Sequence, residues 1–97
     1  MEKMRLGRTD LMVSRSGFGA LPIQRVDTET VTEILQAAVD KGINFFDTAR
    51  NYSDSEEKIG RALSHVRQDI IIATKTHAPD RGTLFKDLET SLENLKT

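Results

Sequence analysis

The sequence predicts an α/β fold in which parallel strands alternate with helices. Three strand-then-helix units follow one another along the 97 residues. Two of the predicted strands, 43–47 and 70–75, are nearly continuous apolar runs, as expected for parallel strands that are buried on both faces. Alternation of this kind implies parallel pairing with right-handed crossovers. Two architectures satisfy it: part of a (β/α)8 barrel, and a small doubly wound sheet.

A short hairpin is predicted before the first of these units. Residues 4–6 and 11–13 read as its strands, and the turn between them contains glycine and aspartate. The first strand of the units is predicted at 16–20, where Gly17 and Gly19 permit close approach of a neighbour or ligand. These glycines are not a dinucleotide-binding fingerprint, because the third glycine and its spacing are absent.

The first and third helices are predicted from apolar residues at helical spacing. Asp27 can cap the first helix, and Gly42 stands where a glycine commonly ends one. The stripe of the first helix consists of Val31, Ile34, Leu35, Ala38 and Val39. The third helix follows a break at 79–82, extends to the last residue, and has its stripe at Leu84, Phe85, Leu88, Leu92 and Leu95.

The second helix is predicted to begin after a loop at 51–54. Ser53 and Glu56 fit a capping box, in which the serine and the glutamate satisfy two free amide groups reciprocally. Ser55, Glu56 and Glu57 form a first turn that capping and the helix dipole explain without a binding site. The inner face of this helix consists of Ile59, Ala62, Leu63 and Val66.

Composition excludes several functional classes. The length suits one small domain, and the net charge of −1 with interspersed charges argues against nucleic-acid binding. The chain has no cysteine, so it has no disulfide, thiolate metal site or catalytic thiol, and no metal site is predicted. No signal-peptide core and no apolar run of ~20 residues is present, so the expectation is a soluble cytoplasmic protein without a membrane span.

Three polar residues fall at or after predicted strand ends. Asp47 closes one apolar run, Lys75 closes the next, and Tyr52, the only tyrosine, lies in the loop between them. A phenol has an ordinary pKa near ~10, and a nearby ammonium favours its ionised form. Each residue alone also has a structural interpretation, as an ion-pair partner, a strand terminus or a surface aromatic. Together they predict acid catalysis on a carbonyl oxygen, because a lysine at an apolar strand end requires a partner such as Asp47.

The two histidines have mainly structural interpretations. His77 follows Lys75 by two residues, so strand alternation could place both on one face, at the mouth of the site. A loop position is the commoner outcome for such a residue. His65 is predicted at the end of the second helix, where a cation suits the helix dipole.

Three stretches of the sequence carry a family resemblance. They are Leu6–Thr9 with Val13, Ser14 and Gly17–Gly19; Lys41–Ala49 with Tyr52, Ser55 and Glu56; and Ile72–Lys75. In these stretches the sequence resembles the aldo-keto reductase family, and the resemblance extends over essentially the whole chain. Residues 19–26 are most similar to the branch whose members often carry a C-terminal iron–sulfur region.

The resemblance implies a fold, a reaction and a site. The fold is an α/β (β/α)8 TIM-barrel type, of which residues 1–97 are the N-terminal hairpin and the first three βα units, as a single domain. The reaction is reduction of a small-molecule carbonyl to an alcohol with NADP(H) or NAD(H). The implied catalytic residues are Tyr52 as general acid, Lys75 as the cation that makes it a stronger acid, and Asp47 as the partner of Lys75. The implied cofactor-binding residues are Gly19, Ala20, Leu21 and Asp47.

Three units cannot close a barrel, which needs ~250 residues. The family's catalytic histidine would follow a fourth strand beyond Thr97, and so would the loops that bind the adenosine phosphate and pyrophosphate. We therefore expect the isolated chain to be inactive or nearly so. The alternative is a non-catalytic α/β module that forms a homo-oligomer through its two unpaired sheet edges. A third interpretation is a binding subunit of this family, such as a chaperone or channel subunit, that retains the same residues.

Overall fold

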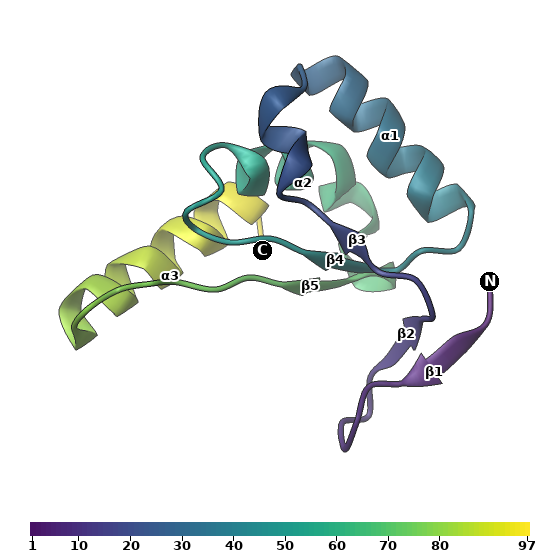
Figure 1. The fold of residues 1–97 in the computed structure, drawn as a ribbon, viewed down its shortest axis with the longest axis horizontal. Helices are drawn as coiled ribbons and strands as arrows, with labels where there is room; N and C mark the ends of the chain where they lie inside the picture. The colour runs from purple at the N-terminus through teal and green to yellow at the C-terminus, as the bar shows by residue number, and fades with distance from the viewer.

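The computed structural model describes residues 1–97 and contains two separate β-sheets (Figure 1). Strands β1 (Lys3–Arg5) and β2 (Met12–Ser14) form an antiparallel hairpin. Strands β3 (Phe18–Gly19), β4 (Phe45–Asp47) and β5 (Ile71–Ala73) form a parallel sheet in that order. The predicted hairpin and the predicted parallel pairing are both confirmed.

A helix follows each parallel strand. These helices are α1 (Thr28–Asp40), α2 (Ser55–Leu63) and α3 (Arg81–Leu95). A 3-10 helix η1 (Pro22–Arg25), which the sequence does not predict, precedes α1. The sequence pattern extends the second helix to Val66, but the backbone there has a φ of −117°, and the 3-10 segment η2 (Ser64–Asp69) replaces the last turn.

Local capping explains where α1 and α3 begin. The Asp27 carboxylate accepts a hydrogen bond from Thr30 N at 3.1 Å, which confirms the predicted cap of α1. At the predicted break before α3, Asp80 accepts from Thr83 N at 2.8 Å in the same way. Gly42 follows α1 with a φ of 96°, a left-handed value that favours glycine.

One apolar core lies between the parallel sheet and its helices. Figure 1 shows α1 and α2 on one side of the sheet. The largest fully buried apolar side chains are Phe46, Leu35, Ile59, Leu63 and Val31. Burying a side chain of this size contributes about 1.5–3 kcal/mol relative to leaving it exposed. This core packs the sheet and two helices into one unit, and it fixes the positions of the strand ends relative to the helices.

The opposite face of the sheet carries Gly19, Asp47 and Ala73. Side chains alternate along a strand, and Phe46, next to Asp47, faces the core. In the register of the sheet, Gly19 is level with Asp47, and Asp47 is level with Ala73. Asp47 and Ala73 are only partly buried, and Gly19 is exposed. The residues just after these three positions therefore meet along one edge of the sheet.

Helix α3 is attached to the rest of the molecule mainly through its C-terminal end. Leu95 is buried, and Gly60 of α2 lies directly against the backbone of Asn94 and Leu95. Its first turns project away from the other helices (Figure 1). The remaining apolar residues of its predicted stripe, Leu84, Phe85, Leu88 and Leu92, are between 42% and 48% exposed. None of the helices is long and apolar enough to cross a membrane.

Candidate active site

The three side chains predicted to form the site meet at the C-terminal edge of the parallel sheet. Lys75 Nζ donates to Asp47 Oδ2 at 3.2 Å and to Thr48 O at 2.7 Å. The same Nζ lies over the Tyr52 ring, 5.0 Å from its centroid. A cation in this position is attracted to the face of an aromatic ring. Asp47, Tyr52 and Lys75 are therefore gathered around one ammonium group.

Pairing of β4 with β5 positions the lysine. The ladder of backbone hydrogen bonds continues past the strand ends, from Thr48 N to Ala73 O at 2.8 Å and from Arg50 N to Lys75 O at 2.9 Å. These bonds hold the backbone of Lys75 beside the segment that leads from β4 to Tyr52. The convergence of the three side chains thus follows from strand register.

Tyr52 lies in a tight turn between β4 and α2. Tyr52 N donates to Ala49 O at 3.1 Å, and Ser55 N donates to Tyr52 O at 2.8 Å. Arg50 Nη2 donates to Ser53 O at 3.3 Å, so its guanidinium bridges the turn on both sides of Tyr52. Ser53 has a φ of 40°, which is uncommon for a residue other than glycine. The turn is therefore held by several bonds and not by local preference alone.

The ion pair is open to solvent, with the Lys75 and Asp47 side chains 44% and 49% exposed. Desolvation lowers the pKa of the Lys75 ammonium, but the hydrogen bond and charge of Asp47, together with Tyr52, outweigh it. The net effect is a pKa of Lys75 above its ordinary 10.5. Lys75 is therefore fully charged at neutral pH. Exposed pairs of this kind add at most about 1 kcal/mol to folding stability. The main effect of this pair is therefore to hold the Lys75 ammonium in place and to keep it charged.

The residues predicted to border a cofactor lie at the same edge but differ in accessibility. Gly19 pairs with Asp47 in the sheet, and a Cβ atom built on Gly19 would meet no atom within 4 Å. Leu21 is 54% exposed, whereas Ala20 is fully buried. Ala20 N donates to Asp47 O at 2.8 Å. Gly19 and Leu21 therefore offer free surface beside Asp47, and Ala20 keeps this segment against β4.

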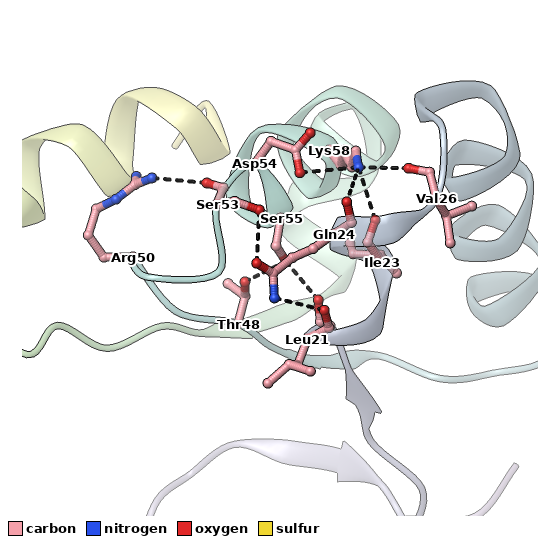
Figure 2. Close-up of polar contacts among 11 residues, drawn as sticks. Leu21, Ile23, Gln24, Val26, Thr48, Arg50, Ser53, Asp54, Ser55 and Lys58 are labelled. Carbon is pink, nitrogen blue, oxygen red and sulfur yellow. Dashed lines mark hydrogen bonds and ion pairs between the residues drawn. The ribbon is translucent and has the colours of Figure 1, made fainter.

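A buried lysine on α2, which no sequence motif singles out, holds the segment after β3 (Figure 2). Lys58 Nζ donates to Ile23 O at 3.0 Å and to Val26 O at 2.7 Å, and its side chain is only 7% exposed. It also forms an ion pair with Asp54 at 3.1 Å, outside hydrogen-bonding geometry. A lysine in a helix is ordinarily exposed, and the carbonyls it binds lie more than 30 residues away. No local sequence signal identifies such a contact.

The capping box predicted for Ser53 and Glu56 is wrong. Helix α2 begins at Ser55, and Ser53 Oγ donates instead to Gln24 Oε1 at 2.8 Å. Ser55 is fully buried, and its Oγ donates to Ala20 O at 3.0 Å. These hydroxyl groups connect the segment after β3 with the start of α2. Tertiary partners have replaced the local amide groups that a capping box would satisfy.

Glu56 is fully buried, although the sequence assigns it to a first turn that capping and the helix dipole explain. Its exposed fraction is 0%, and its Oε1 forms an ion pair with Arg50 Nη1. Its Oε2 accepts a hydrogen bond from Thr74 Oγ1 at 2.7 Å, and Asn94 Nδ2 lies 3.5 Å from Oε1. Burial of a carboxylate is costly unless it is paired and hydrogen-bonded. These partners satisfy both oxygens, whereas the neighbouring Glu57 is exposed.

Other candidate features do not join the site. His77 lies in the loop after β5, where its Nδ1 is 3.2 Å from Asn51 Nδ2. A surface hollow of about 390 Å³ lies between α2 and the ends of α1 and α3 and includes none of the three gathered residues. No cluster of three histidine, aspartate or glutamate side chains lies where it could hold a metal ion.

Comparisons of the sequence identify related proteins. A sequence model of the aldo/keto reductase family matches residues 15–97. The uncharacterized oxidoreductase YqkF of Bacillus subtilis is 39% identical over 111 residues, which cover 100% of this chain and 36% of that protein. A protein of Oryza sativa, named a probable voltage-gated potassium channel subunit beta, is 35% identical over 91% of this chain and 29% of its own. The chain spans about a third of the length of these curated relatives.

Solved structures extend the likeness to the fold. The aldo-keto reductase AKR11C1 from Bacillus halodurans, in its holo form, matches with a TM-score of 0.87 and 33% identity. The match covers 100% of this chain and 37% of that one. Such neighbours are (β/α)8 barrels, so the three βα units are part of a barrel-type fold whose sheet is unclosed over these residues. The predicted barrel-type fold is confirmed, and the doubly wound sheet is not formed.

Proposed function

Because the chain belongs to the aldo/keto reductase family, we propose that Asp47, Tyr52 and Lys75 are part of an active site that reduces a small-molecule carbonyl to an alcohol. Oxidoreductases and aldo-keto reductases among the relatives support this reaction class. One observation carries the proposal. The Lys75 ammonium pairs with Asp47 at 3.2 Å and lies 5.0 Å from the centre of the Tyr52 ring.

In this proposal Tyr52 is the general acid. A carbonyl oxygen gains negative charge as its carbon accepts hydride, and the Tyr52 hydroxyl donates a proton to that oxygen. A phenol is ordinarily a weak acid at neutral pH, and an adjacent ammonium stabilises the phenolate that remains. Lys75 supplies that ammonium. Asp47 keeps Lys75 charged and in place, which the raised pKa of Lys75 supports.

The residues present fit the nicotinamide end of NADPH or NADH. Free space lies over Gly19, where a Cβ atom would meet nothing within 4 Å, and this position is level with Asp47 in the sheet. Gly19, Leu21 and Asp47 would hold that end of the cofactor, which supplies hydride when bound. Ala20 would act through its backbone, which joins β4 by a bond of 2.8 Å.

A chimera tests the assignment of Tyr52. Residues 1–97 replace the structurally matched segment of the Bacillus halodurans enzyme, and NADPH oxidation is followed with a reactive aldehyde. Tyr52→Phe should lower kcat by at least ~100-fold, because positioned general acids contribute ~10²–10⁴-fold. Glu57→Gln, on the exposed side of α2, is the matched control and should leave kcat unchanged. Equal turnover with and without Tyr52→Phe would exclude Tyr52 as the acid.

We also propose that the 97-residue chain by itself has no reductase turnover. It spans about a third of the length of its relatives, and the family resemblance places a further catalytic group, a histidine, outside these residues. A steady-state assay of the purified chain with NADPH and a reactive aldehyde checks this. Turnover comparable to that of a complete reductase would contradict it.

A second candidate function, self-association, is supported by surface left without partners. Strands β3 and β5 each have a neighbour on one side only, and four apolar side chains of α3 are between 42% and 48% exposed. Open strand edges and exposed apolar patches favour association. Sedimentation at micromolar concentration should show an oligomer that Leu88→Lys weakens and Glu89→Lys does not. A stable monomer would contradict this candidate.

A further inference from the structure

We propose that Glu56 is a positioning residue for the Tyr52–Lys75 pair, an inference that rests on the proposed function. Its buried carboxylate joins the two segments that carry these side chains. Oε1 pairs with Arg50, which lies two residues before Tyr52. Oε2 accepts from Thr74 at 2.7 Å, and Thr74 is the residue before Lys75. One group thus sets how the acid lies relative to its lysine.

Arg50 connects Glu56 to the turn that holds Tyr52. Arg50 Nη2 donates to Ser53 O at 3.3 Å, so the guanidinium spans the turn (Figure 2). The φ of 40° at Ser53 is a conformation that persists only where the surroundings hold it. The backbone amide of Arg50 also donates to Lys75 O at 2.9 Å. Glu56 therefore fixes Arg50, and Arg50 restrains both the turn and the backbone of Lys75.

Stability alone does not account for this arrangement. Buried ion pairs are often no more stabilising than apolar side chains of similar volume, because desolvation offsets the attraction between the charges. A carboxylate with a guanidinium on one oxygen and a hydroxyl on the other does, however, specify distances and angles that an apolar contact leaves loose. In this structure the specified distance is the one between the Tyr52 turn and the end of β5.

The single tyrosine provides a direct readout of that distance. The chain has one tyrosine, so the aromatic NMR signals that Tyr52→Leu removes are those of the Tyr52 ring. Because Lys75 Nζ lies over the ring at 5.0 Å, the ε-methylene protons of Lys75 should show an upfield ring-current shift. Tyr52→Leu removes the ring and defines zero shift. Glu57→Gln, which makes the same chemical change at the exposed neighbour, is the control for charge.

In the full 97-residue chain, Glu56→Gln should lose the ring-current shift and the cross peaks between Tyr52 and Lys75 while its amide spectrum stays dispersed. Glu57→Gln should keep both signals. A folded Glu56→Gln chain with the full shift overturns the proposal, because Glu56 would then be only structural. A wild-type chain with no shift relative to Tyr52→Leu overturns it as well.

A second variant covers the case in which Glu56→Gln does not fold. Thr74→Val removes only the hydroxyl that donates to Oε2 and keeps the shape of the side chain. The proposal requires this variant to reduce the shift, and an unchanged shift overturns it. None of these measurements needs turnover. If Tyr52→Phe left kcat of the chimera unchanged, the proposed reaction would be contradicted. If Glu56→Gln or Thr74→Val left the Lys75 ring-current shift unchanged, only the positioning by Glu56 would be contradicted.

Discussion

Lys75 donates to the backbone carbonyl of Thr48 at 2.7 Å, a shorter contact than the 3.2 Å it makes with the Asp47 carboxylate. The ammonium is thus held at the end of β4 by a neutral acceptor as well as by a charged one. The carbonyl helps to fix the position of the lysine, and the carboxylate contributes to its raised pKa. A substitution of Asp47 can therefore change the protonation of Lys75 while the contact with Thr48 keeps the ammonium in position.

Asp47→Asn should lower the pKa of the Lys75 ammonium without displacing it. The substitution removes a negative charge and a charge-assisted hydrogen bond, both of which raise that pKa above 10.5 in the native chain. An NMR titration of the Lys75 side chain measures the change, and the contact with Thr48 should persist. Asp10→Asn, in the hairpin turn, is the control. An unchanged Lys75 titration in Asp47→Asn would contradict the assigned cause.

The stabilising effect of Lys75 should disappear at high pH. Its pKa is higher in the folded chain than the ordinary 10.5, so the folded state binds this proton more tightly than the unfolded state does. The contribution is fully present below that value and is lost as pH rises through the folded pKa. Urea denaturation of Lys75→Met and wild type should differ by less than ~1 kcal/mol at pH 7, because the pair is exposed, and by less still once the pH exceeds the raised pKa of Lys75. Lys86→Met is the control, with no such pH dependence.

Gly60→Ala should separate α2 from α3. A Cβ atom at Gly60 would collide with the carbonyl oxygen of Asn94 and lie 3.0 Å from Leu95 Cα. Overpacking of this kind costs roughly 1–3 kcal/mol of unfolding free energy. Gly82→Ala is the matched control, since its Cβ would meet nothing closer than 3.5 Å, and it should stabilise the chain by up to ~1 kcal/mol. Chemical denaturation measures both, and equal effects would contradict the close helix contact.

Acid should weaken the caps of α1 and α3. Hydrogen bonds from the side chain and backbone of Thr30 lower the pKa of Asp27 below 3.8, and those from the backbone and side chain of Thr83 do the same for Asp80. Both contributions are present above 3.8 and are lost as pH falls through the lower folded values. The double variant Asp27→Asn, Asp80→Asn keeps side chains that can cap but cannot titrate. Its unfolding midpoint should therefore fall less than that of wild type between about pH 5 and pH 2.

Local signals in the sequence predict the order of elements well. Helix α1, its cap at Asp27 and the glycine at Gly42 all appear where the residues indicate, although Ile34 of the predicted apolar stripe is 40% exposed. These features depend on contacts within a few residues, so they can be read without knowledge of the fold. The 3-10 helix η1 is different, because Lys58 holds its carbonyls from α2, more than 30 residues away.

The candidate site was predictable as far as its three gathered residues. Asp47 and Lys75 end apolar runs, and parallel strands bring such ends together. The support around them was not predictable. Glu56 follows a serine and precedes another glutamate, a pattern typical of a solvated first turn, yet it is fully buried. Its partners Thr74 and Asn94 lie 18 and 38 residues further along the chain.

The sequence by itself determined the βα alternation, the cap of α1 at Asp27 and the position of Asp47, Tyr52 and Lys75 at or after strand ends, because periodicity, capping and strand ends are local properties. Only the tertiary structure decided that Lys75 reaches both Asp47 and the Tyr52 ring, and that Glu56 and Lys58 are buried. The physical reason is desolvation. A charged side chain leaves water only where partners from distant segments satisfy it, and strand register and helix packing determine where those partners lie.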